Sequence, residues 1–155
     1  MKKRQAKRYR VREVFWTVAR EPGAPPPRSI TSSEDAGRLA RDLAERADDD
    51  REHFWVLLLN TQNKLLAVHE VSVGSISATV VDPRGVFGPA LREGAASIIL
   101  VHSHPSGDPT PSEVDIKLTR DLVDAGNVVE VRVLDHIIVG SGSGDFISLA
   151  QEGKL

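Results

Sequence analysis

The segment that most constrains the fold is the apolar run at residues 95–101, followed by a loop rich in proline and then by a helical pattern. The run AASIILV has the length of a buried strand and is too short for an average helix. The sequence PSGDPTP, residues 105–111, belongs in the interior of neither a helix nor a strand. Ser112 then opens SEVDIKLTRDLVDAG, a pattern typical of a helix. We therefore expect a strand, a tight loop and a helix in direct succession.

Two histidines and one aspartate fall at the facing ends of these predicted elements. His102 and His104 stand two residues apart at the end of the strand, so their side chains project from the same face. Asp115 lies in the first turn of the helix. Two imidazoles and a carboxylate form a typical catalytic zinc site, which keeps a fourth position open. The spacing predicts one zinc ion per chain, held by His102, His104 and Asp115.

Ser112 and Asp115 also fit a purely structural role. Ser-x-x-Asp is close to the helix capping box, in which the serine caps free N–H groups and an acidic residue three positions later bonds back. The two roles are compatible, because Ser112 can cap the helix while Asp115 faces a metal. The conjunction with the two histidines favours the metal site.

The sequence His102-Ser-His104-Pro, six residues, Ser112-x-x-Asp115 resembles the JAMM (MPN+) metalloprotease motif at every defining position. The flanking sequences HFWVLLLNTQNKLLAVHEVSVGS, VRVLDHIIVG and SLAQEGKL are similar to the bacterial RadC family, from residue 30 to residue 155. The resemblance implies a zinc-dependent hydrolase that cleaves a peptide or isopeptide amide bond, in a family named for DNA repair. Full RadC proteins also carry a helix-hairpin-helix region, which this sequence lacks.

The resemblance further implies two catalytic residues. A glutamate in the first half of the domain would act as general base and then as general acid, and Glu70 is the position that looks equivalent. The alternative is that Glu70 points outward on an edge strand; Glu52 and Glu93 are then the next candidates. The hydroxyl of Ser112 would donate to the oxyanion that forms when water attacks the carbonyl.

Composition limits the other possibilities. With 155 residues and 40% hydrophobic content, the chain can form one domain with a genuine core. The absence of cysteine excludes disulfides, thiol nucleophiles and cysteine-ligated zinc, and it fits a cytoplasmic protein. No apolar run approaches the roughly 18 residues of a membrane span, and no secretory signal is expected.

The N-terminal segment is strongly basic, whereas the rest of the chain is acidic. We expect residues 1–28 to form a basic arm with a proline-rich linker and residues 29–155 to form the RadC-like domain. The arm is either a solvated tail or a weak contact for nucleic acid. The alternative function is therefore a DNA-associated accessory module with a structural metal. The basic residues of the arm are Lys2, Lys3, Arg4, Lys7, Arg8, Arg10 and Arg12.

Strand and helix patterns alternate along the domain without a repeating βαβ period, and hairpins are present. This favours an α/β fold with a mixed β-sheet flanked by helices, as in the JAMM/MPN, cytidine-deaminase-like sandwich that the resemblance implies. Helices are expected at 33–47, 83–94 and 112–126, although Gly85 and Gly88 should bend or fray the second. Strands are expected at 54–59, 64–73, 78–81, 95–101, 128–139 and 146–149.

Overall fold

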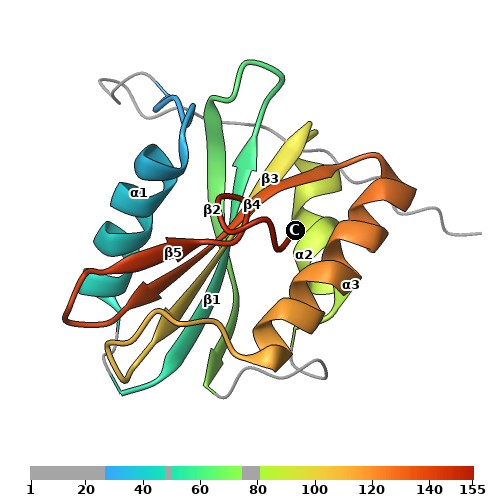
Figure 1. The fold of residues 1–155 in the computed structure, drawn as a ribbon. Helices are drawn as coiled ribbons and strands as arrows, with labels where there is room; N and C mark the ends of the chain where they lie inside the picture. The colour runs from blue at the N-terminus through green and yellow to red at the C-terminus, as the bar shows by residue number, and fades with distance from the viewer. Residues whose placement is uncertain (1–26, 48–49, 75–80) are drawn as a thin grey trace, which may run out of the picture.

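The computed structural model describes residues 27–47, 50–74 and 81–155 (Figure 1). Its three helices are α1 (Ser33–Arg46), α2 (Pro83–Arg92) and α3 (Glu113–Val129). Its five strands are β1 (Glu52–Leu59), β2 (Leu65–Gly74), β3 (Ser97–His104), β4 (Arg132–Gly140) and β5 (Phe146–Ser148).

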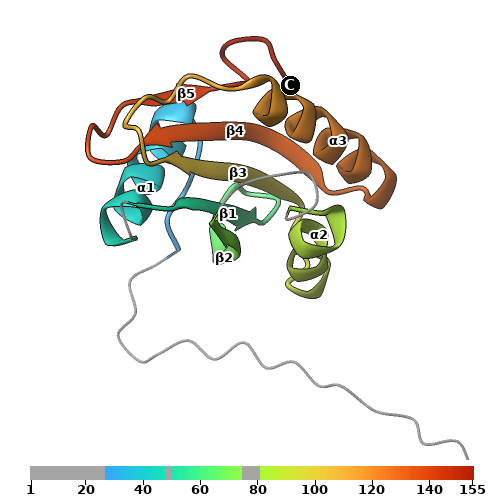
Figure 2. The same cartoon turned by 90° about the horizontal axis from the view of Figure 1, so that it is seen from below.

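The strands form one sheet in the order β2-β1-β3-β4-β5. Only β3 and β4 are parallel, and α3 connects them, while the other neighbouring pairs are antiparallel. Helix α1 covers one face of the sheet, and α2 and α3 lie on the other (Figures 1 and 2). The expected α/β fold with a mixed sheet flanked by helices is therefore confirmed.

Alternation along the strands divides the core into two layers. In β1, Phe54, Val56 and Leu58 pack toward α2 and α3, whereas Trp55, Leu57 and Leu59 belong to the layer of α1. All of these side chains are buried, as expected for a strand between two neighbours in a sheet that is covered on both faces. Even-numbered side chains of β1 and β3 therefore lie on the face of α2 and α3, and odd-numbered ones lie on the face of α1.

Helix α2 forms despite its two interior glycines. Asp82 caps it by accepting a hydrogen bond from the backbone of Gly85, and Pro83 occupies the first turn, where its missing N–H costs nothing. Val86, Phe87 and Ala90 are buried against the core. Tertiary packing thus outweighs the low helix propensity that predicted a bent or frayed segment.

The end of α3 corrects the expected start of the next strand. Residues 128 and 129 were expected in a strand because valine is β-branched, but α3 continues through Val129 and ends at Glu130, which has a left-handed backbone with φ of 59°. Gly126 allows this turn, since a Cβ there would lie 2.5 Å from the carbonyl oxygen of Val131. Strand β4 consequently begins at Arg132.

Two further expectations fall on segments outside the described residues. The short strand at 78–81 lies almost entirely outside them, as does the whole basic arm with Lys2, Lys3, Arg4, Lys7, Arg8, Arg10 and Arg12. Among the helices that the structure describes, none combines the length and apolar character that crossing a membrane requires.

Candidate metal centre

The end of β3 presents the two histidines on the face covered by α2 and α3. His102 pairs with Phe54 of β1 on one side and with Ile138 of β4 on the other, and it is 1% exposed. His104 follows on the same face and is more accessible. Their rings stand perpendicular, with centroids 4.6 Å apart. The strand therefore delivers two imidazoles to one point, as the His-x-His spacing predicts.

The loop after β3 orients the ring of His104. Nδ1 of His104 lies 2.9 Å from the carbonyl oxygen of Asp108, and because a carbonyl only accepts, Nδ1 carries the hydrogen. In the neutral ring the lone pair is therefore on Nε2, which is the nitrogen that would bind a metal. The loop is anchored on Gly140 of β4, where a Cβ would lie 2.0 Å from the carbonyl oxygen of Gly107. Only glycine permits this close approach.

Helix α3 begins at the same point and supplies Asp115. The carboxylate accepts hydrogen bonds at Oδ2 from the backbone N–H and the hydroxyl of Ser112, both at 2.7 Å, while the backbone N–H of Asp115 donates to Ser112 Oγ at 3.1 Å. The predicted capping box is thus present. Oδ1 lies 3.1 Å from Nδ1 of His102, and Oδ2 lies 3.4 Å from Nε2 of His104.

The electrostatics of Asp115 favour the carboxylate. Burial opposes its ionisation, but the interactions with His102 and His104 and the hydrogen bonds from Ser112 outweigh burial and hold its pKa well below the usual range. The same carboxylate, with the carbonyl of Asp108, raises the pKa of His104 against the opposing effect of burial. A charged carboxylate buried between two imidazoles is suited to a cation.

Glu52, the first residue of β1, also reaches this point. Its carboxylate and the ring nitrogens of His102 and His104 offer ligand atoms within 4.8 Å of one another. These residues, together with Ser112, Val114 and Asp115, line a cavity of about 360 Å³. In the sequence, Glu52 follows a charged stretch and carries no motif of its own, so it was only a reserve candidate for the general base.

His102 supplies a test of whether a metal fits this cavity. Neither of its ring nitrogens has a hydrogen-bond partner, even though Nδ1 lies close to Asp115, because that contact lacks hydrogen-bond geometry. A buried polar atom without a partner is costly. Coordination to a cation would satisfy one of these nitrogens. The donors whose ligand atoms lie together are His102, His104 and the Glu52 carboxylate, and their chemistry fits a zinc ion. Asp115 lines the same cavity but is not one of this group of three.

Glu70 lies elsewhere. It pairs with Trp55, whose side chain belongs to the layer of α1, whereas the histidines share the opposite face with Phe54. Its Oε2 accepts a hydrogen bond from Nε1 of Trp55 at 3.0 Å and lies 3.3 Å from Nδ1 of His53. The structure therefore does not bring Glu70 to the histidines, and this geometry does not support its expected role as general base.

His136 lies behind the site. Its Nδ1 is 2.6 Å from Oγ1 of Thr119, and that hydroxyl donates to the backbone carbonyl of Asp115 at 2.6 Å. Complete burial, with a smaller contribution from His102, lowers the pKa of His136 to about 3. A neutral His136 therefore supports the first turn of α3 from below.

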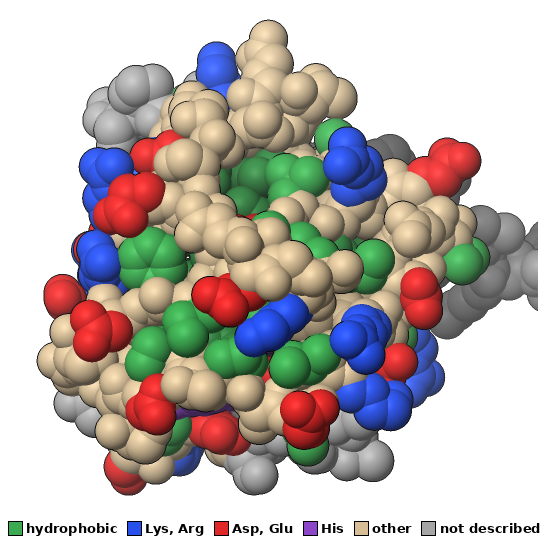
Figure 3. Space-filling model, viewed as in Figure 1, with side chains coloured by type: hydrophobic (Ala, Val, Ile, Leu, Met, Phe, Trp, Pro, Cys, Tyr) green, Lys and Arg blue, Asp and Glu red, His purple; other side chains and the backbone are tan. Residues whose placement is uncertain are grey.

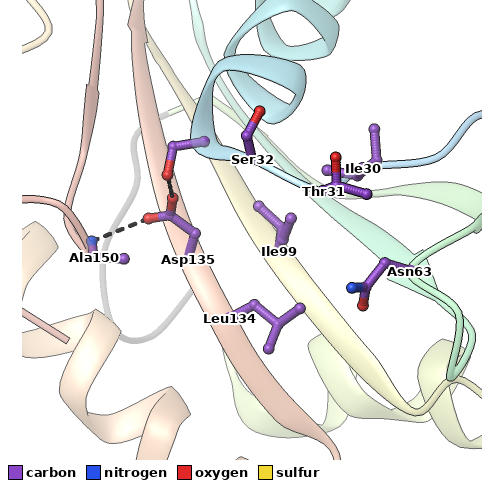
Figure 4. A pocket seen from close by; sticks show the side chains of 9 residues that line it. Ile30, Thr31, Ser32, Asn63, Ile99, Leu134, Asp135 and Ala150 are labelled. Carbon is purple, nitrogen blue, oxygen red and sulfur yellow. Dashed lines mark hydrogen bonds between the residues drawn. The ribbon is translucent and has the colours of Figure 1, made fainter.

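A second hollow, of about 240 Å³, lies on the α1 side of the sheet (Figure 4). Its acidic side chain is Asp135, whose oxygens accept hydrogen bonds from the hydroxyls of Ser33 and Ser148 and from the backbone of His136 and Ala150. These bonds tie the C-terminal segment to α1 and β4. Because the Asp135 carboxylate is occupied by these hydrogen bonds, we interpret its role in this hollow as structural.

Charge on the molecular surface is mixed on the face drawn in Figure 3, where basic and acidic side chains are interspersed around apolar groups. Among the described residues drawn on this face, lysine and arginine side chains form no broad basic surface of the kind that binds a phosphate backbone.

The sequence matches the family described as "RadC-like JAB domain" over residues 30–154. It is 48% identical over 125 residues to a UPF0758 protein of Caldanaerobacter subterraneus subsp. tengcongensis, covering 81% of this chain and 52% of that protein. It is 48% identical over 141 residues to a UPF0758 protein of Desulforudis audaxviator, covering 91% and 59%. A UPF0758 protein of Rubrobacter xylanophilus is 44% identical over 139 residues, covering 90% and 58%. The chain thus spans little more than half the length of these curated relatives.

Proposed function

This chain belongs to the RadC-like JAB domain family, and on that premise we propose that it is a zinc-dependent hydrolase that cleaves a peptide or isopeptide amide bond. The observation that carries the proposal is the convergence of Glu52 from β1, His102 and His104 from β3, and Asp115 from α3 on one cavity. Strand β1 lies far from β3 and α3 in the sequence, and each of the three elements contributes a side chain of the type that such chemistry requires.

In this proposal His102, His104 and Asp115 hold one zinc ion per chain. A zinc ion bound there would lower the pKa of a water molecule and polarise the substrate carbonyl. Three protein ligands leave a coordination position for that chemistry, whereas a fourth ligand would make the site structural. We therefore assign Glu52 to proton transfer and not to coordination.

Glu52 replaces Glu70 as the proposed general base. It lies on the same face as the histidines and lines the cavity, so it can take a proton from water there and deliver it to the leaving amine. Glu70 would have to act through the sheet. The accessibility of the cavity, with Val114 at its edge 52% exposed, suits a substrate as large as an extended peptide.

Ser112 keeps its proposed role as oxyanion donor. It lines the cavity, but its hydroxyl already donates to Oδ2 of Asp115. The hydroxyl has one hydrogen, so the role requires rotation about the Cα–Cβ bond toward the substrate. The backbone N–H of Ser112 would continue to hold Asp115 during that rotation.

The experiment is a cleavage assay on a library of unmodified and isopeptide-linked peptides, with the same preparation analysed for metal. We expect cleavage that a chelator abolishes and added zinc restores, and that is lost in Glu52→Gln. Chelator-insensitive cleavage, or a zinc-loaded protein that cleaves no member of either class, would contradict the proposal.

A further inference from the structure

We propose that Val114 selects an apolar side chain in the substrate, on the residue that supplies the carbonyl group of the scissile bond. The inference rests on the proposed function, because it names the class of substrate that the same cavity takes. It makes Val114 a specificity-determining residue and gives it no part in the bond cleavage itself.

The packing of α3 does not account for a valine at position 114. The side chain is 52% exposed and lies beside the buried stripe of the helix. Valine has a low helix propensity, and the first turn of a helix favours acidic residues such as its neighbours Glu113 and Asp115. The buried stripe consists of Asp115, Leu118, Thr119, Leu122 and Gly126.

Val114 lines the cavity of the candidate metal centre, where apolar surface is scarce. Among the described residues that line this cavity, Val114 and Pro105 are the apolar ones, and both are exposed. Ligand sites use a few polar groups for orientation and apolar surface to bury the rest of the ligand. The polar and charged residues of the lining are Glu52, His102, His104, Ser106, Ser112 and Asp115.

A second hollow, of about 420 Å³, adjoins this cavity and indicates how the substrate lies. The two hollows share Glu52 and Pro105, so Glu52 stands between them. A substrate longer than one residue on each side of the scissile bond can therefore occupy both hollows. The other residues that line the second hollow are Asp50, Arg51 and Gly74.

The proposed roles of Glu52 and Ser112 set the direction of the substrate. Glu52 delivers a proton to the leaving amine, so the amine side extends past Glu52 into the second hollow. Ser112 donates to the oxyanion on the carbonyl carbon, and it lines the first cavity together with Val114. The residue that supplies the carbonyl therefore lies on the side of Val114.

The chemistry of this surface defines what it selects. The side chains of Val114 and Pro105 neither donate nor accept hydrogen bonds, so a substrate side chain gains there by leaving water. A charged or amide side chain would lose hydrogen bonds to water without replacement. One methylene in an apolar pocket changes kcat/KM by about 10- to 200-fold. Because Val114 lies at an open edge, we expect the lower end of that range, about tenfold.

The test uses two peptides built on a sequence that the zinc-loaded full chain cleaves. They differ in carrying leucine or glycine at the residue that supplies the scissile carbonyl. The wild-type chain should prefer leucine, and Val114→Ala should lower kcat/KM for the leucine peptide about tenfold. It should change kcat/KM for the glycine peptide by less than about twofold, because glycine has no side chain to contact residue 114. Alanine raises helix propensity, so this variant should fold.

Val128→Ala is the matched control. Val128 is a valine of the same helix and is 83% exposed, but it lies at the opposite end of α3 and does not line the cavity. Its replacement should leave kcat/KM for both peptides within about twofold of wild type. A second pair of peptides, with leucine or glycine at the residue that supplies the amine, tests the direction. Val114→Ala should affect both members of that pair equally.

The outcomes separate this inference from the proposed function. Cleavage without a preference for leucine, or an equal loss on the leucine and glycine peptides in Val114→Ala, would overturn the selection by Val114 and leave the hydrolase in place. A selective loss confined to the amine-side pair would overturn the direction, and with it the inference. A zinc-loaded wild-type chain that cleaves no peptide of either class would overturn the proposed function and this inference together.

Discussion

Ser112 and Asp115 hold each other in two directions. The Ser112 hydroxyl donates to Oδ2 of Asp115 at 2.7 Å, and the backbone N–H of Asp115 donates to the same hydroxyl oxygen at 3.1 Å. The capping box and the proposed metal ligand therefore share one carboxylate. The cap occupies Oδ2, while Oδ1 faces His102. The contacts between Ser112 and Asp115 that begin α3 therefore also fix the position of the proposed ligand Asp115.

Replacement of Ser112 separates its two roles. Ser112→Ala should destabilise the fold by about 1 kcal/mol through loss of the cap, and it should lower kcat about a hundredfold if the hydroxyl stabilises the oxyanion. Ser112→Thr keeps a hydroxyl that can donate and accept, and should retain most of both properties. Thermal unfolding and steady-state kinetics on the same preparations provide the measurement. A kcat within threefold of wild type in Ser112→Ala would leave Ser112 as a helix cap alone.

The two glutamates give opposite expectations. Glu52→Gln removes a proton acceptor without removing a proposed ligand, so the protein should keep its zinc and lose at least about a hundredfold in kcat. Glu70→Gln keeps a hydrogen-bond acceptor for Trp55 and should stay active. Metal analysis and the peptide assay decide between them. Loss of zinc in Glu52→Gln would make Glu52 a ligand, and loss of activity in Glu70→Gln with zinc retained would return the general base to Glu70.

Stability should fall in mild acid because of His136. Burial lowers its pKa to about 3 in the folded state, below the ordinary value of 6.5, so the unfolded chain binds the extra proton between these values. The contribution of His136 to the free energy of unfolding is then fully present above pH 6.5. It decreases as pH falls toward 3, with a slope of at most about 1.4 kcal/mol per pH unit. Urea unfolding across this range, with chelator present, measures the slope. His136→Gln should flatten the curve, and an unchanged slope in that variant would assign it to other groups.

The close contact between the loop and Gly140 predicts that alanine has opposite effects on stability at two glycine positions. Gly140→Ala would place a Cβ against the carbonyl of Gly107, so it should displace the loop that orients the His104 ring and lower both stability and zinc affinity. Gly88→Ala meets no atom within 4 Å in helix α2 and should stabilise the protein by about 0.5–1 kcal/mol without affecting zinc. Thermal unfolding and chelator competition test both. Equal behaviour of the two variants would contradict the loop contact.

Local signals were sufficient for the strand, loop and helix around the histidines. Alternation places His102 and His104 on one face, proline ends the strand, and Ser112 with Asp115 starts the helix within a few residues. The end of α3 was predicted incorrectly, because β-branching at Val128 and Val129 is a weak preference that a continuing helix overrides.

The face occupied by Glu70 depends on a non-local feature. The bulge in β2 pairs Ser72 with Phe54 and Glu70 with Trp55. Without that extra residue, Glu70 would pair with Val56 and share a face with the histidines. A shift of one residue in the register moves every side chain of a strand to the other face. Nothing in the local sequence marks the bulge. The position of Glu52 in the site could not be predicted from local sequence either, because only the pairing of β1 with β3 brings the start of β1 beside His102.

Metal content tests the proposed centre most directly. The full chain, purified and supplemented with zinc, should bind close to one zinc ion per chain by elemental analysis. His104→Ala and Asp115→Ala should lose it while remaining folded by circular dichroism, and Glu70→Gln should retain it as the matched carboxylate control. A wild-type chain that holds no divalent metal after supplementation, or an Asp115→Ala variant that holds a full equivalent, would contradict the assignment of His102, His104 and Asp115 as a zinc site.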